Sequence, residues 1–226
     1  MKHPKLNVYL LLWLFVLWGN PSYTQDSPVS VHTRNVIWTT PVRKNTIING
    51  IAIGIQSTTG GGANLLKING LNIELEPFGI IGGLYAIGGT IASISRHSIP
   101  DSMIQGRADL VSRTAFTENN QHATSKIKGV SFSLGGLMDN LELSGVGING
   151  VISFANRVNG IELTGIMNLH YEFNGIMIAG LRNKVTKVNG LQVGLINTCK
   201  DGRVVQLGLI NRIGKRITPV LNFKLR

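Results

Sequence analysis

Apolar and polar residues alternate along most of the chain after residue 46. Leu71, Ile73 and Leu75, for example, alternate with Asn72 and Glu74. A period of two places successive side chains on opposite faces of a β-strand, whereas a helix needs a period near 3.6. The pattern therefore predicts an all-β chain.

The alternating segments also resemble one another. Four of them align near the C-terminus: residues 159–168, 174–183, 189–197 and 204–211. Their closing asparagines are Asn168, Asn183, Asn197 and Asn211, at spacings of 15, 14 and 14 residues. Looser copies occupy 49–55, 69–75, 128–134 and 149–156. Recurrence at a near-constant period indicates a repeat architecture with one strand per unit.

This spacing predicts a repetitive meander of roughly 12 short strands. We expect strands at 47–56, 67–76, 79–87, 89–96, 104–115, 126–136, 140–147, 149–156, 159–168, 174–183, 188–197, 203–211 and 216–224.

One turn suggests how neighbouring strands pair. Lys200-Asp201-Gly202 has the composition of a three-residue hairpin loop. If Cys199 pairs with Arg203, Leu195 lies opposite Leu207 and the aliphatic faces of the two strands coincide. This register predicts antiparallel neighbours.

Two architectures can use such a repeat, and we expect the first. It is a β-barrel in the outer membrane, with aliphatic residues facing lipid and polar residues facing inward. In it, inward carboxylates pair with Lys or Arg; these are Glu74, Glu76, Glu142 and Glu162. The alternating C-terminal segment 219–226 resembles a closing barrel strand.

The alternative is a β-solenoid, in which the aliphatic face forms the core and Asn and Gly stack at the corners. It is favoured because every unit has the same polarity, whereas alternate barrel strands run in opposite directions. Aromatic residues make up only 6% of the chain, which also disfavours a barrel with aromatic girdles.

The N-terminus predicts export. Lys2 and Lys5 precede an apolar run from Leu6 to Trp18 and a short polar region, so we expect a signal peptide at 1–24. An irregular lead-in follows at 25–45, with a short strand possible around Val36 to Thr39. Residues 46–226 then form a single β-repeat domain.

The charge and the composition of the chain limit the classes of molecule that it is expected to bind. The net charge is +11, and no run of Lys and Arg is interleaved with aromatics. For an exported protein this favours outer-membrane lipid or lipopolysaccharide over nucleic acid. The single cysteine, Cys199, allows no disulfide framework.

The repeat units resemble a known family. Asn-Gly-Leu-Gln-Val-Gly-Leu-Ile-Asn at 189–197, Val-Gln-Leu-Gly-Leu-Ile-Asn at 205–211 and Pro-Val-Leu-Asn-Phe at 219–223 are similar to the tandem units of bacterial surface-repeat proteins. The resemblance is close over 159–223 and looser over 47–156. It implies a surface or outer-membrane location and no established activity.

No residue pattern indicates catalysis. Gly60-Gly61-Gly62 lacks the Lys and Ser or Thr of a phosphate-binding loop, and His32, His97, His122 and His170 have no ligand spacing. We therefore expect no enzyme, no cofactor and no metal site. The sequence predicts a non-enzymatic exported surface or outer-membrane protein with a structural or small-pore role. The alternative is a soluble secreted or periplasmic binding module.

Overall fold

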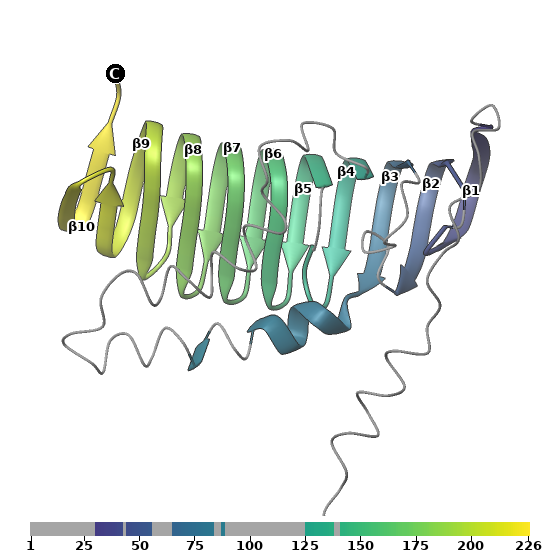
Figure 1. The fold of residues 1–226 in the computed structure, drawn as a ribbon, viewed down its shortest axis with the longest axis horizontal. Coiled ribbons are helices and arrows are strands. Elements are labelled where there is room, and N and C mark those ends of the chain that lie inside the picture. The colour runs from purple at the N-terminus through teal and green to yellow at the C-terminus, as the bar shows by residue number, and fades with distance from the viewer. Residues whose placement is uncertain (1–29, 43, 56–64, 84–86, 89–124, 138–140) are drawn as a thin grey trace, which may run out of the picture.

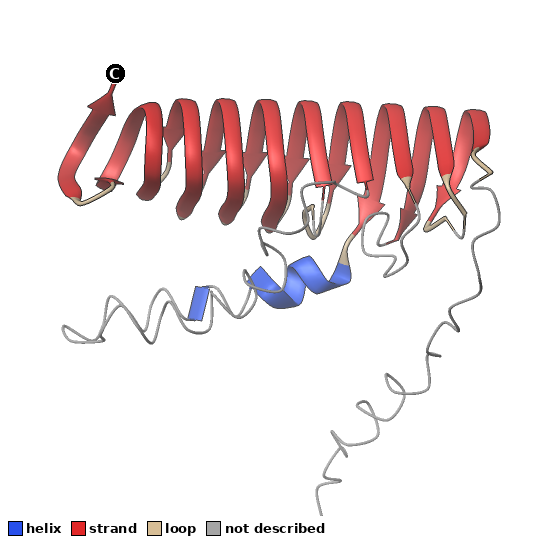
Figure 2. Cartoon of the chain, turned by 45° about the horizontal axis from the view of Figure 1, so that its top comes forward, coloured by secondary structure: helices blue, strands red, loops and turns tan. Residues whose placement is uncertain are grey.

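The computed structural model describes residues 30–42, 44–55, 65–83, 87–88, 125–137 and 141–226. The chain winds as successive coils along one axis and forms a β-solenoid (Figures 1 and 2). The ten strands in the described residues are β1 (His32–Thr40), β2 (Thr46–Ile55), β3 (Leu66–Leu75), β4 (Ser125–Ser133), β5 (Leu141–Asn149), β6 (Ile152–Thr164), β7 (Met167–Ala179), β8 (Arg182–Val193), β9 (Ile196–Ile213) and β10 (Arg216–Lys224).

Neighbouring strands are parallel from β1 to β9, and only β10 runs antiparallel to its neighbour β9. In this register Asn159 pairs with Asn174, and Asn174 with Asn189. Each of these coils therefore contains 15 residues, one sequence repeat. Parallel neighbours cannot be joined by a tight hairpin, so the chain passes once around the coil before it pairs again.

The expected closed barrel is therefore wrong, and so is the hairpin at Lys200 to Gly202. The strand β9 runs unbroken through these residues, and Cys199 pairs in parallel with Val185. Gly202 allows two coils to approach instead of turning the chain back: a Cβ there would lie 1.8 Å from the Val188 carbonyl oxygen. A glycine flanked by alternating residues suits both a hairpin turn and a close contact between coils. The sequence pattern alone therefore does not distinguish the two.

Most other expected strands correspond to observed ones, with shifted ends. The segments 47–56, 67–76 and 126–136 match β2, β3 and β4, while 149–156 joins part of 159–168 in β6. The strand expected around Val36 to Thr39 is part of β1. The expected strands 89–96 and 104–115 and the signal peptide lie outside the described residues.

The expected strand 79–87 is wrong, because residues 77–83 and 87–88 are helical. Pro77 suits the first position of a helix, and the Glu76 carboxylate accepts a hydrogen bond from the Phe78 N–H at 3.3 Å. The close approach of Gly79 to the Gly135 carbonyl places this helix against the turns of the solenoid. Period-two reasoning missed the Glu-Pro start signal.

A column of glycines recurs at the same point of the coils. Gly160 and Gly175 pair across β6 and β7, with φ angles of 142° and 134°. Side chains rarely adopt these angles, and a Cβ at Gly175 would lie 1.9 Å from the Gly160 carbonyl oxygen. The same column contains Gly50, Gly70, Gly129, Gly145 and Gly190. The repeated glycine thus permits one coil to lie directly on the previous one.

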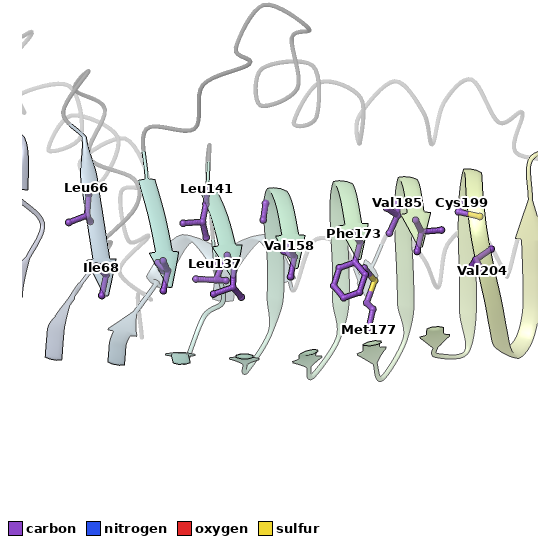
Figure 3. Packing of buried hydrophobic residues seen from close by; sticks show 14 of the residues in the cluster. Leu66, Ile68, Leu137, Leu141, Val158, Phe173, Met177, Val185, Cys199 and Val204 are labelled. Atoms are coloured by element: carbon purple, nitrogen blue, oxygen red, sulfur yellow. The ribbon is translucent and has the colours of Figure 1, made fainter. Parts of the chain in front are cut away.

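The hydrophobic core follows this column. Two residues before each glycine, an apolar side chain points into the coil and is at most 1% exposed (Figure 3). This core column consists of Ile48, Ile68, Ile127, Leu143, Val158, Phe173 and Val188. Burial of each such side chain contributes about 1.5–3 kcal/mol, which ties every coil to its neighbours.

Different devices close the two ends. At the N-terminal end, Arg34 pairs with Ile48 and Trp38 with Ala52, and the Arg34 guanidinium lies 4.1 Å from the Trp38 ring centroid. This cation–π pair covers the first core residues. At the other end β10 folds back over β9, and the Asn222 side chain donates a hydrogen bond to the Asn211 carbonyl at 3.1 Å.

Replacement of a column glycine should destabilise the protein. We expect Gly175→Ala to lower the free energy of unfolding by about 2 kcal/mol or more, because it adds backbone strain and a clash with the preceding coil. Urea unfolding followed by circular dichroism measures this loss. Gly82→Ala is the matched control, since a Cβ there meets nothing within 4 Å. Equal losses in both variants would contradict a special role for the column.

Candidate interaction surface and buried polar network

Aliphatic side chains cover one outer face of the solenoid. One and three residues after each column glycine, Ile, Leu, Val or Phe points outward in nearly every coil. We call this set the aliphatic face. In register order its first column is Ile37, Ile51, Leu71, Val130, Val146, Ile161, Ile176, Leu191, Val205 and Phe223, and its second is Thr39, Ile53, Ile73, Phe132, Ile148, Leu163, Ile178, Val193, Leu207 and Leu221.

These side chains remain accessible to solvent. Ile53, Ile73, Phe132, Ile161 and Leu207 are between 41% and 45% exposed. Adjacent strands lie about 4.8 Å apart, so ten strands span roughly 43 Å, and the three residue positions that the two columns cover span about 10 Å. An apolar patch on the order of 500 Å² is among the largest that monomers usually present, and such patches mark interaction sites.

The solenoid alternative had placed the aliphatic face in the core, and this expectation is wrong. The in–out alternation continues through the glycine without a break: Val158 and Glu162 point inward, whereas Arg157 and Ile161 point outward. Burial of a whole column of charged residues would cost far more than exposure of isoleucines. The charged column therefore fixes which side of each strand faces water, and the aliphatic column has to follow.

Apart from Met177, the inward positions behind the aliphatic face carry polar or small residues. The Asn72 side chain donates a hydrogen bond to Ser131 Oγ at 3.0 Å, and the Gln206 side chain donates one to Gln192 Oε1 at 2.7 Å. All four residues are fully buried. Hydrogen bonds between successive coils thus offset part of the cost of burying these polar groups.

A charged column lies on the other side of the glycine column. Three residues before the glycines, residues of opposite sign alternate over much of the rod: Lys67, Lys126, Glu142, Arg157, Glu172, Lys187 and Asp201. Lys126 pairs with Glu142 at 3.0 Å and Arg157 with Glu172 at 2.6 Å. Asp201 pairs with Lys224 of β10 at 2.6 Å, and this hydrogen bond lowers the pKa of the Asp201 carboxyl. The pairs link coils that are neighbours in the stack.

Two asparagine ladders run parallel to the axis. The exposed one precedes the glycines, and in it Asn174 donates to Asn159 at 2.8 Å and Asn189 donates to Asn174 at 2.9 Å. The buried one consists of the closing asparagines of the repeat, Asn168, Asn183, Asn197 and Asn211, joined side chain to side chain at 2.8–3.0 Å. The period of the sequence repeat therefore reflects side chains that bond their own counterparts.

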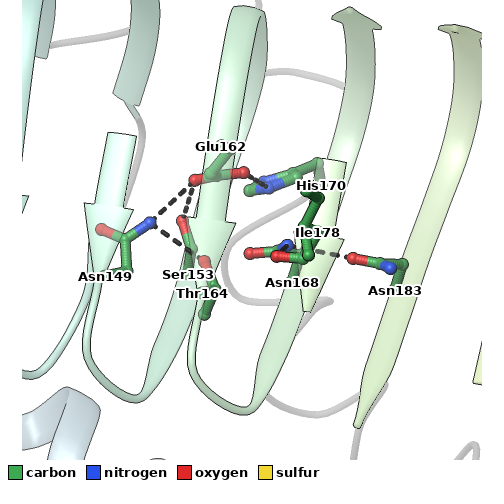
Figure 4. Close-up of polar contacts among 8 residues, drawn as sticks. All are labelled: Asn149, Ser153, Glu162, Thr164, Asn168, His170, Ile178 and Asn183. Atoms are coloured by element: carbon green, nitrogen blue, oxygen red, sulfur yellow. Dashed lines mark hydrogen bonds and ion pairs between the residues drawn. The ribbon is translucent and has the colours of Figure 1, made fainter. Parts of the chain in front are cut away.

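The most polar part of the interior surrounds Glu162 (Figure 4). Glu162 Oε1 accepts hydrogen bonds from the Asn149 amide at 3.0 Å and the Ser153 hydroxyl at 2.7 Å. Glu162 Oε2 lies 2.6 Å from His170 Nε2, and the His170 ring stacks on Phe173. The Glu162 and His170 side chains are both 0% exposed. Ser, Glu and His side chains also occur together in acid–base catalytic sites, but here they lie inside the coil, where they act as a structural network.

The four carboxylates expected inside a barrel separate into two groups. Glu74, Glu76 and Glu162 are buried within the coils, whereas Glu142 points outward to Lys126. The predicted Lys or Arg partner therefore holds for Glu142, while Glu162 is paired with His170 instead. The sequence pattern indicates no partner for His170, because that partner lies eight positions away across a coil corner.

The remaining sequence candidates that the structure describes do not gather into a site. Cys199 is buried at 1% exposure, and His32 lies in β1, far along the rod from His170. His97, His122 and Gly60 to Gly62 lie outside the described residues. Within the described parts of the chain, no cluster of His, Cys, Asp and Glu is arranged to hold a metal ion. In those same parts, no helix has the length and apolarity to cross a membrane.

Comparison with known proteins gives no guide to this surface. No family model, no curated protein and no solved structure matches the chain.

The buried network around Glu162 makes a prediction about stability. The equivalent positions of the next coil carry Met177 and Val185 in place of Glu162 and His170. We expect His170→Val to cost about 3 kcal/mol, because the buried carboxyl loses its partner. The double variant with Glu162→Met should regain about half of that loss or more, since it copies an apolar pair that already fits the coil. Urea unfolding of both single variants and the double variant gives the coupling energy, and additive losses would contradict it.

Cys199 provides a second test. Burial, reinforced by the nearby Asp201 charge, raises the pKa of the thiol from 9.0 to about 11. Because the folded pKa is the higher one, this contribution to stability is present below pH 9 and is lost as pH rises towards 11. We expect little thiol labelling of the folded protein at neutral pH and complete labelling in urea. Cys199→Val should weaken the decline in stability above pH 9; an unchanged decline would rule out Cys199 as its source.

Proposed function

We propose that the protein is a non-enzymatic, exported scaffold of the cell surface or outer membrane, and that the aliphatic face is its working surface. The observation that carries this proposal is the pair of outward aliphatic columns, continued from β2 to β10 with no polar residue among them in the described strands. A soluble fold with no partner gains nothing from such an arrangement.

A second apolar cluster of the solenoid is covered, in contrast to the aliphatic face. Ile152, Phe154 and Met167 form a second apolar cluster and are at most 8% exposed. This cluster packs with Val151 and Ile166, the residues nearest to Gly83 of the helix at 77–83. Among the described residues, the aliphatic face combines large area, regular spacing and exposure, so it is the surface we expect a partner to cover.

A catalytic role is not part of the proposal. The Ser153, Glu162 and His170 side chains meet inside the coil, but the residues are at most 4% exposed, so a substrate has no access to them. A pore role is not retained either, because it depended on a closed barrel, and the solenoid interior is filled with side chains.

A second candidate function is a soluble secreted or periplasmic binding module. The charged column favours it, because three ion pairs and the exposed asparagine ladder present a well-hydrated surface on the adjoining side of the rod. The two candidates differ in where the processed chain resides, which cell fractionation measures.

We expect the wild-type chain, produced with its N-terminal segment in a Gram-negative host, to be recovered with the envelope. The triple variant Ile161→Thr, Leu163→Thr, Ile176→Thr should pass mostly into the soluble periplasmic fraction. Threonine retains β-propensity but removes apolar outer surface, so the fold should survive.

The matched control is Asn159→Thr, Asn174→Thr, Asn189→Thr, which alters the same coils in the adjoining column. It should remain with the envelope. Circular dichroism must show the same strand content in all three proteins. Recovery of wild type in the soluble fraction would favour the binding module. Retention in the envelope of the triple variant at Ile161, Leu163 and Ile176, the aliphatic variant, would refute the aliphatic face as the working surface.

A further inference from the structure

The proposed function requires a partner that covers the aliphatic face. We infer that its partner is the surface of an anionic phospholipid bilayer, on which the solenoid lies with its long axis in the membrane plane. This inference rests on the proposed function and specifies its partner. Four properties of the described residues carry it: the absence of polar groups on the face, its area, the charge of the rod and the pairing of the backbone.

The two aliphatic columns provide no directional contacts. From β2 to β10 their outward positions hold only Ile, Leu, Val and Phe. A specific protein interface usually carries about one hydrogen bond per 100–200 Å² and a few large anchoring residues that fill pockets. A lipid surface needs neither, because acyl chains adapt to any flat apolar surface.

The size of the face and the charge of the rod argue against a second copy as the partner. A stable dimer buries about 800 Å² on each side, more than the roughly 500 Å² that this face offers. Among the described residues 16 Lys and Arg oppose 6 Asp and Glu. Two such rods placed face to face would repel each other, whereas an anionic surface would attract each of them.

The exposed charge of the rod is even more one-sided. Three of the six acidic residues, Glu74, Glu76 and Glu162, are buried. The other three, Glu142, Glu172 and Asp201, are each held by a Lys or Arg in an ion pair. The described surface therefore presents little negative charge to repel phosphate headgroups.

Basic residues also lie at the border of the face. Lys128 and Arg203 occupy the column directly before the glycines, next to the first aliphatic column, and both are exposed. The C-terminal coil adds seven basic residues and a single acidic residue, Asp201. The basic residues are Lys200, Arg203, Arg212, Lys215, Arg216, Lys224 and Arg226. Long basic side chains can reach headgroups while the adjacent aliphatic residues contact acyl chains.

The backbone permits contact with lipid. Along the aliphatic face, the N–H and C=O groups of β2 to β9 take part in the ladder between coils and do not point out of the face. The cost of bringing unpaired amides to an apolar environment is therefore avoided. Because the columns run along the solenoid axis, contact through all of them requires the axis to lie parallel to the membrane.

Vesicle flotation tests this inference on the chain purified from expressing cells. We expect binding to vesicles of phosphatidylcholine mixed with phosphatidylglycerol, and much weaker binding to phosphatidylcholine alone. Ile161→Thr, Leu163→Thr, Ile176→Thr should lower the bound fraction about tenfold, because it removes apolar contact. Lys128→Gln with Arg203→Gln should lower binding to the anionic vesicles roughly tenfold, an effect that raised salt reproduces in wild type. The Asn159, Asn174, Asn189 control should bind like wild type.

Two results would overturn the lipid partner. One is a folded wild-type chain that floats with neither vesicle. The other is a wild-type dimer in analytical ultracentrifugation without lipid, converted to a monomer by the aliphatic variant, which would identify a second copy as the partner. In both cases release of the aliphatic variant from the envelope would still support the proposed function. Failure of that release, with vesicle binding intact, would refute the proposed function separately.

Discussion

The stacking of each coil on the carbonyl oxygens of the previous coil governs the rest of this structure. Where Gly160 faces Gly175, no atom larger than hydrogen fits between the two chains. Because this contact is repeated in register, all side chains at one position of the repeat form straight columns along the rod. The core column, the asparagine ladders, the charged column and the aliphatic face are all consequences of that single alignment.

Columns amplify whatever chemistry the repeat contains. A single Asn–Asn hydrogen bond contributes little, but the buried ladder of four asparagines links four successive coils through their side chains. The same amplification turns one outward isoleucine per coil, unremarkable by itself, into a continuous apolar face. The proposed function follows from this geometry and not from any reactive residue.

Much of this organisation could be predicted from the sequence. The period of two, the repeat length and the all-β class follow directly from residues 159–211, and three expected strands match β2 to β4. The choice between a barrel and a solenoid could not be predicted, because a repeat of alternating residues has the same pattern in antiparallel and parallel strands. The Glu162–His170 contact could not be predicted either, since it joins residues across a corner whose geometry exists only in the coil. The aliphatic face points outward because burying the charged column would cost more than exposing the aliphatic columns. A single repeat unit does not show this energy balance.

The first coil departs from the glycine rule. Val36 lies in register with Gly50 and has a φ of 77°. Its φ is therefore positive, as at the column glycines, but Val36 carries a side chain. At each column glycine from Gly50 to Gly190, a Cβ would meet the preceding coil's carbonyl oxygen, and β9 carries Val204 in this register. A side chain on this backbone conformation extends towards the place of a preceding coil, so Val36 opposes the in-register addition of another molecule at β1. The rod carries its own terminator against end-to-end fibre growth, a hazard for any protein built from identical stacked strands.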